Sequence, residues 1–238
     1  KWFPPVLLGL LTALVWGQCV TFQFVWDDRF FIENLQSIRS LKHVPDMFVS
    51  AEASAPPEFK IPLFRPLRTV HYALLFLLGG GEPPRPWIFH LANLIWHAAV
   101  GTALFSFCFR LFRRVGVDAE PECRRWALWA AAAFVVHPVT SEVVCWAKSL
   151  DDLMAAFFVL MGVRSLLGGK PLKAVCFPAL LWFLAAVYSK ESAAPFALAA
   201  WFVLRRVRGE TFRTSAVWSI PFLAAAFGYT VHRHCVLE

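Results

Sequence analysis

Long apolar stretches separated by short polar turns dominate the pattern of this chain. The first stretch covers residues 6–25, and about 20 apolar residues are enough for a helix to cross the hydrocarbon core of a bilayer. Further stretches lie at 87–109, 126–145, 152–168, 172–188, 192–207 and 214–235. The pattern predicts an all-α fold, a polytopic membrane bundle of about seven transmembrane helices.

One further apolar segment, residues 67–78, is too short for the same interpretation. It precedes a turn at Gly79-Gly80-Gly81, and apolar segments of about 10–14 residues are more often interfacial or re-entrant than spanning. If it lies at the surface, the basic residues of the short connections share one side: Lys1, Arg110, Arg113, Arg114, Arg124, Arg125, Arg164, Lys170, Lys173, Arg205, Arg206, Arg208 and Arg213. Because short-loop Lys and Arg set orientation, we expect a cytoplasmic N-terminus and a long extracytoplasmic loop at 27–86, with two or three interfacial helices.

Composition agrees with a membrane protein. Of the 238 residues, 58% are hydrophobic, whereas a soluble domain averages about 45–50% apolar residues. The net charge of +7 would suit nucleic acid, but the basic residues cluster between apolar stretches, where the positive-inside rule alone explains them. We expect one membrane domain over residues 1–238, surrounded by membrane lipids and without a nucleic-acid partner.

Two adjacent carboxylates, Asp27 and Asp28, stand where the first apolar stretch ends. Acids at the edge of a membrane are costly when desolvated, so they need a partner or a task. A general base requires a carboxylate within reach of a hydroxyl, and burial raises its pKa toward a useful range. The alternative is a solvated helix N-terminus, where Asp interacts favourably with the helix dipole. We favour the catalytic interpretation.

Other polar residues converge on the same predicted side from separate turns of the chain: Arg65, His90, Asn93, Glu142, Lys148, Asp151, Asp152, Lys190 and Glu191. Such convergence of acids with a few cations predicts an active site. His90 and Asn93 share one helix face with His97, which favours hydrogen bonding between helices or a cavity lining over a metal site.

The remaining members of this set have open alternatives. Lys190 lies in a charged turn between two apolar stretches, so it requires an anionic partner. The candidates are the phosphate of a lipid-linked substrate, a lipid headgroup or the neighbouring Glu191. Arg65 alone is typical of a lipid-headgroup anchor. Glu142 and Asp152 either orient an acceptor, hold a divalent cation such as Mg²⁺ or Mn²⁺, or form a polar surface turn. No cofactor is fixed by the sequence.

Five motifs, taken in order, resemble the membrane module of the GT-C superfamily of lipid-linked sugar transferases. The nearest resemblance is to the transmembrane-and-tetratricopeptide O-mannosyltransferase-like proteins and their bacterial counterparts. The matching stretches are Trp26-Asp27-Asp28 with Asn34, Arg65-Pro66-Leu67, the run from His90 to His97, the run from His137 to Glu142 with Trp146 and Asp152-Leu153, and Ser189-Lys190-Glu191. Relatives usually carry a basic residue where this chain has Leu150, and no tetratricopeptide period follows Tyr229.

This resemblance implies an inverting transfer from a polyprenyl- or dolichyl-phosphate sugar to a protein hydroxyl on the extracytoplasmic face. It implies that Asp27 or Asp28 is the catalytic base and that Lys190, with Arg65, binds the donor phosphate. Glu142 and Asp152 would shape the acceptor or cation site, with His90 and Asn93 lining the cavity. The expected location is a bacterial inner membrane, or the endoplasmic reticulum membrane of a eukaryote. The alternative is a non-catalytic membrane subunit of this descent that packs against other subunits, with a repeat domain outside this chain.

Overall fold

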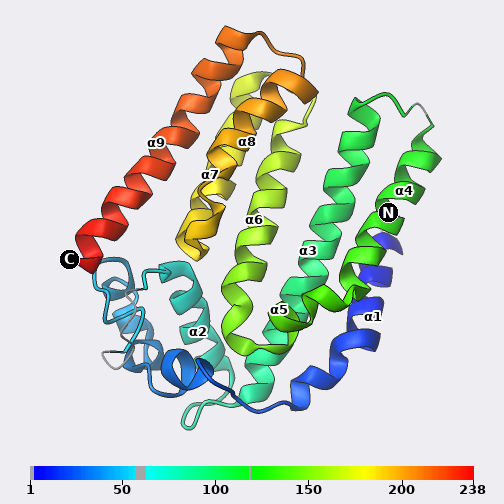
Figure 1. Cartoon of the computed structure of the whole chain (residues 1–238). Coiled ribbons are helices and arrows are strands. Elements are labelled where there is room, and N and C mark those ends of the chain that lie inside the picture. The colour runs from blue at the N-terminus through cyan, green and yellow to red at the C-terminus, as the bar shows by residue number, and fades with distance from the viewer. Residues whose placement is uncertain (1–2, 57–62, 118) are drawn as a thin grey trace.

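The computed structural model of the chain describes residues 3–56, 63–117 and 119–238. Within these ranges the regular structure is helical, with no strand (Figure 1). The α-helices are α1 (Phe3–Trp16), α2 (Pro66–Leu78), α3 (Pro86–Arg114), α4 (Glu120–Val136), α5 (Ser141–Cys145), α6 (Leu150–Leu166), α7 (Leu172–Ser189), α8 (Phe196–Phe202) and α9 (Phe212–Leu237). Short 3₁₀ or π turns connect or extend them, and four of these lie between Arg29 and Phe48.

Proline and threonine define several helix starts. Helices α2 and α3 begin at Pro66 and Pro86, where the missing N–H of proline costs nothing and its φ already suits a helix. Thr211 caps α9, because its hydroxyl accepts a hydrogen bond from the Thr214 N–H at 3.1 Å. Helix α2 ends at Leu78, directly before the three glycines.

The helices form two neighbouring groups, α1 with α3 and α4, and α6 with α7, α8 and α9 (Figure 1). Helix α3 contacts α6 and so joins the groups. Helix α2 and the short turns between Arg29 and Phe48 gather at one end of the bundle. We call this the loop end, and the other end, where α3 and α6 finish, the far end.

Four helical segments of the described chain are long and apolar enough to cross a membrane: Phe3–Thr21, Pro86–Arg114, Leu172–Ser189 and Phe212–Leu237. A fifth span is possible only if Glu120–Val136 and Pro138–Cys145, which are bent by 53° relative to each other, are counted as one. The chain is therefore a helical protein with four or five apolar helices of spanning length. Seven spans stay a prediction, because α6 has 17 residues and α8 gives way to a π turn after 7 residues.

The short segment 67–78 forms the helix that its length predicts, α2. Apart from α2, the described residues of the loop, 27–56 and 63–86, form short turns rather than further α-helices, and the turns between Arg29 and Phe48 fold onto α2. Phe31, Ile32 and Met47 are completely buried in one apolar cluster with Tyr72 of α2. The loop is thus a packed cap on the loop end of the bundle, held by apolar burial.

Helices α1, α3 and α4 meet at one backbone carbonyl. The indole N–H of Trp16 donates to the Val135 carbonyl at 2.7 Å, and His97 Nε2 lies 3.1 Å from the same oxygen. Gly101 of α3 allows this approach, since a Cβ atom there would lie 2.4 Å from Val135 Cγ1. Small residues at such contacts let helix backbones approach closely within a membrane.

Replacing Gly101 with Ala should therefore destabilise the fold by about 1–3 kcal/mol, because the β-branched Val135 cannot easily rotate away. The double variant Gly101→Ala, Val135→Ala removes the clashing methyl and should recover part of the loss. Thermal unfolding in detergent would measure both effects. An unchanged melting temperature in the single variant would contradict the close packing of α3 on α4.

Candidate active site

Asp28 is buried at the loop end and ties two distant segments together. One carboxylate oxygen accepts a hydrogen bond from the Val25 N–H at 3.0 Å, and the other accepts from the Lys148 N–H at 2.8 Å. Burial raises the pKa of Asp28 to about 6, although these two hydrogen bonds oppose the shift. Both oxygens are thus occupied by backbone donors.

Asp27 differs from its neighbour in exposure. Its side chain is 32% exposed, and its Oδ2 lies 3.9 Å from Nζ of Lys148. The Lys148 ammonium also lies 5.1 Å from the centre of the Trp146 ring, and Trp26 packs edge-on against the same ring. Trp26 has a φ of 46°, a left-handed conformation that is unusual for a bulky residue. The hydrogen bonds of Asp28 hold this turn, so Asp27 is presented toward the surface beside a cation.

A second group of charges is centred on Asp151, in the first turn of α6. Its carboxylate is completely buried and lies 2.6 Å from Nη1 of Arg65 and 3.7 Å from Nη1 of Arg68. Arg65 also forms a fork with Glu191, through Nε at 2.9 Å and Nη2 at 2.5 Å. The Arg68 guanidinium donates to the Ser54 carbonyl at 2.9 Å. Helix α2, helix α6 and the turn after α7 are joined here by buried ion pairs.

These pairs determine the charge states. Burial alone would lower the pKa of Arg65, but its hydrogen bonds to Glu191 and the charge of Asp151 raise it. Burial alone would raise the pKa of Glu191, but the hydrogen bonds and charge of Arg65 lower it to about 2. Arg65 and Glu191 are therefore ionised at neutral pH and committed to each other.

Lys190 lies at the edge of this group and is the more accessible cation. Its Nζ is 2.5 Å from Oδ1 of Asp152 and 4.0 Å from Oδ1 of Asp151, and its side chain is 19% exposed. Asp152 is 37% exposed. Both side chains of this pair are thus partly accessible to solvent.

Residues 148–152 connect the two groups. Lys148 contacts both Asp27 and Asp28, and four residues later Asp152 contacts Lys190. The Tyr72 hydroxyl of α2 holds this segment by donating a hydrogen bond to the Lys148 carbonyl at 3.0 Å. This short turn thus places the partly exposed carboxylate of Asp27 and the partly exposed ammonium of Lys190 at the same end of the bundle.

The other predicted residues have different roles. Asn93 is buried on α3 and donates to the Trp146 carbonyl at 2.7 Å, so it supports the turn that carries Lys148. His90 is buried one turn earlier and packs edge-on against Phe22. Glu142 is exposed on α5 and joins no ion pair among the described residues. The predicted cluster therefore includes Asp27, Asp28, Arg65, Asp152 and Lys190, supported by Asn93, but not Glu142.

Arg68 and Tyr72 complete the site without having been singled out by the sequence pattern. Both lie within the apolar helix α2, where a position one helical turn after Arg65 is the only signal that marks Arg68. Their burial is clear only from the fold, since residues of the loop and of α6 cover them.

A divalent cation does not fit this arrangement. Within residues 3–56, 63–117 and 119–238, no three His, Cys, Asp or Glu side chains are grouped as metal ligands. Asp151, Asp152 and Glu191 are each paired with a basic side chain at 2.6 Å or less.

Apolar helices of spanning length and a charged site at one end define the class, a helical membrane protein with carboxylates and cations at the edge of its bundle. The chain is similar to protein O-mannosyl-transferase TMTC4 of Mus musculus, with 26% identity over 164 residues, or 66% of this chain and 22% of that protein. Protein O-mannosyl-transferase tmtc2 of Xenopus laevis is 31% identical over 100 residues, which are 42% of this chain and 10% of that protein. Protein O-mannosyl-transferase TMTC3 of Homo sapiens is 26% identical over 162 residues, which are 67% of this chain and 16% of that protein.

These similarities confirm the resemblance to O-mannosyltransferase-like proteins that the motifs predict. The chain spans less than a quarter of the length of each of these three relatives. No protein-family model matches the chain, and no solved structure matches it.

The Asp151 network predicts unequal effects of two neighbouring substitutions. Asp151→Asn leaves Arg65 and Arg68 without their shared buried counter-charge and should cost about 3–5 kcal/mol of stability. The matched control Asp152→Asn removes a more exposed pair and should cost less than about 1 kcal/mol. Denaturation of both variants in detergent would measure the difference, and equal effects would contradict the central role of Asp151.

Proposed function

We propose that this chain transfers a mannosyl group from a polyprenyl- or dolichyl-phosphate donor to a Ser or Thr hydroxyl of a protein, at the loop end of the bundle. The observation that carries the proposal is the turn at 148–152, which contacts Asp27 on one side and Lys190 on the other. A base and a phosphate-binding cation are the two groups that such a transfer requires. The names of the three relatives support the choice of sugar and of a protein acceptor.

Asp27 is the proposed general base, because it alone of the acidic pair has an exposed carboxylate. It would accept the proton of the acceptor hydroxyl while that oxygen forms a bond to the anomeric carbon of the sugar. The bond from this carbon to the phosphate oxygen breaks on the opposite face, so the configuration inverts. The lipid phosphate leaves with the electron pair of the broken bond.

Lys190 is the proposed partner of the departing phosphate. Its ammonium is held by Asp152 and remains partly exposed, so an incoming phosphate can share it. An apolar pocket of about 350 Å³ lies next to this turn, lined by Phe48, Leu67, Leu184, Ala185 and Tyr188. Leu67 follows Arg65 on α2, and Tyr188 precedes Lys190 by two residues. An isoprenoid tail attached to the phosphate suits such a surface.

Asp28 and Arg65 are proposed to position these groups rather than to touch the substrates. Both oxygens of Asp28 accept backbone N–H groups, and the Arg65 guanidinium is committed to Asp151 and Glu191. Asp28 fixes the turn that presents Asp27, whereas Arg65 fixes the turn that presents Lys190.

The loop end is proposed to face away from the cytoplasm, in a bacterial inner membrane or the endoplasmic reticulum. The support is the accumulation of basic residues at the far end, which the positive-inside rule assigns to the cytoplasm. A non-catalytic subunit with the same fold is the alternative. It would show no sugar transfer by the unmodified chain and would lose nothing on substitution of Asp27.

The Asp27→Asn variant should lose sugar transfer by about 100-fold or more, since general-base catalysis contributes about 10²–10⁴. Its fold should persist, because the side chain is partly exposed and Asn is isosteric. Transfer of radiolabelled mannose from dolichyl-phosphate mannose to membrane proteins would measure activity. Asp46→Asn, an exposed acid of the same loop, is the matched control and should retain full transfer. Equal activity of both variants would contradict the proposal.

The raised pKa of Asp28 predicts a pH dependence. As pH falls through about 6, Asp28 takes up a proton and one oxygen becomes a poorer acceptor for its backbone donors, so transfer should decline. The folded-state pKa lies above the usual value, so this proton favours the folded state and the decline should not coincide with unfolding. Glu191, with a pKa of about 2, stays ionised in this window. An Asp28→Asn variant should be weakly active at pH 7 and lack the step near pH 6, whereas an unchanged step would contradict the assignment.

A further inference from the structure

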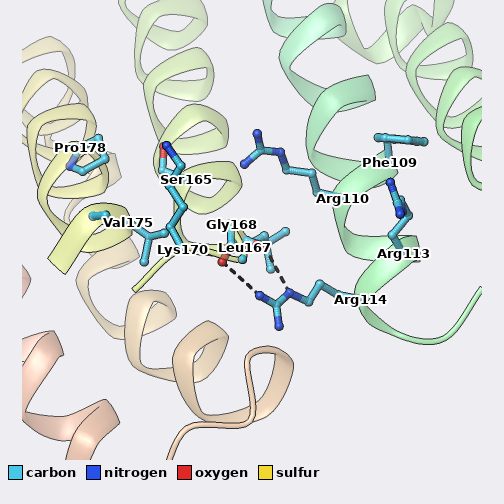
Figure 2. Close-up of a pocket in the computed structure, with 12 residues that line it drawn as sticks. Phe109, Arg110, Arg113, Arg114, Ser165, Leu167, Gly168, Lys170, Val175 and Pro178 are labelled. Carbon is cyan, nitrogen blue, oxygen red and sulfur yellow. Dashed lines mark hydrogen bonds between the residues drawn. The ribbon is translucent and has the colours of Figure 1, made fainter. Parts of the chain in front are cut away.

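A pocket of about 620 Å³ opens at the far end of the bundle (Figure 2). It lies between the end of α3, the turn after α6 and the start of α7. Helix α6 carries Asp151 in its first turn and has 17 residues, and its other end borders the pocket, so the pocket is separated from the candidate active site by about 25 Å of helix. The proposed sugar transfer makes no use of it.

The wall of this pocket carries several positive charges, and none of the described residues that line it is acidic. Arg110, Arg113 and Arg114 come from the last turns of α3, and Lys170 comes from the turn after α6. Figure 2 shows Arg110 and Arg114 projecting from α3 toward this turn. Among the residues that the structure describes, Arg113 is the one of these four cations with an ion-pair partner, Glu120 at 4.0 Å, and both of these side chains are more than half exposed.

Two of the arginines also donate hydrogen bonds to backbone carbonyls at the end of α6. Arg110 donates to the Arg164 carbonyl at 3.0 Å, and Arg114 donates to the Gly168 carbonyl at 3.0 Å. Cations at a helix C-terminus interact favourably with its free carbonyls. Carbonyl oxygens are uncharged, however, so these bonds hold the guanidinium groups in place without neutralising them. The pocket is a preformed cationic site.

Another part of the lining is apolar. Phe109 of α3 and Val175 and Pro178 of α7 belong to it. Their helices, Pro86–Arg114 and Leu172–Ser189, are both of spanning length. A cationic rim above an apolar wall, at the level where spanning helices leave the hydrocarbon, matches a phosphate that carries acyl chains.

We propose that this pocket binds the phosphate headgroup of an anionic phospholipid, with its acyl chains against Phe109, Val175 and Pro178. The phosphate lies among Arg110, Arg113, Arg114 and Lys170. Binding would add a link between α3, α6 and α7 at the far end, where the arginine contacts to the α6 carbonyls and the hydrogen bond from Arg164 to Ser106 already join α3 to α6. The inference does not rest on the proposed sugar transfer.

The test uses the purified chain in nanodiscs of phosphatidylcholine that contain increasing phosphatidylglycerol, with retained lipid counted by native mass spectrometry. The variant Arg113→Gln, Lys170→Gln removes two lining charges that do not hold the end of α6, so the fold should persist. Retention of phosphatidylglycerol should fall about 10- to 30-fold, given the usual contribution of a basic residue to anionic lipid binding.

The matched control is Arg125→Gln, Arg213→Gln, which removes the same charge from exposed residues at the far end that do not line the pocket. It should retain phosphatidylglycerol like the unmodified chain. An equal fall in both double variants, or no fall in either, would overturn the pocket as the binding site. Displacement of phosphatidylglycerol by millimolar inorganic phosphate would overturn the lipid assignment and show that the pocket takes a free anion.

Discussion

The buried carboxylate of Asp151 is the constraint on which the loop end depends. An ionised carboxylate without water is too costly to tolerate unless it is paired and hydrogen-bonded. Asp151 meets this requirement through Arg65, which directly precedes α2, through Arg68 within α2, and through its own helix, since its Oδ1 accepts the Asp152 N–H at 2.9 Å. The first turn of a helix also favours negative charge. Helices α2 and α6 must therefore stay in register, because any shift leaves a charge unpaired.

The position of the candidate active site follows from this register. Arg65 precedes α2, and its second contact is Glu191, so the turn after α7 is fixed by the same guanidinium. Tyr72, two turns further along α2, holds the Lys148 carbonyl, and the Lys148 N–H is held by Asp28. Each contact locates the next segment of backbone. Asp27 and Lys190, which are partly exposed, are thus placed by neighbouring residues that are themselves held by hydrogen bonds and ion pairs.

Much of the fold could be predicted from the hydrophobic pattern, because apolar stretches at 87–109, 172–188 and 214–235 coincide with helices of spanning length. The short helix after Arg65 was equally predictable from its length. The pattern could not distinguish a long helix from two bent pieces. His137-Pro138 breaks the predicted 126–145 span by 53°, and the apolar residues on both sides conceal the break.

The members of the charged cluster could be predicted as a group, since they stand at the ends of apolar stretches. Their separate roles could not. Asp27 and Asp28 are equivalent in sequence, and they differ only because the Lys148 N–H, 120 residues away, reaches Asp28. Glu142 precedes Lys148 by six residues and Asp152 follows it by four, but helix α5 directs Glu142 to the surface. Such distinctions depend on long-range backbone contacts that no local pattern encodes.

The cations near the two ends of α3 have different partners, so the loop end and the far end of the bundle differ in their balance of charge. At the loop end, Arg65, Lys148 and Lys190 each lie within 4.0 Å of a carboxylate, so the cations of the site are largely balanced. At the far end, the hydrogen bonds that Arg110 and Arg114 form within the described ranges go to uncharged backbone carbonyls at the end of α6. Lys and Arg in short connections next to spanning helices set orientation, and nearby Asp and Glu contribute little to it. The far end therefore presents cations suited to the proposed anionic headgroup, whereas the cations of the loop end are paired with carboxylates.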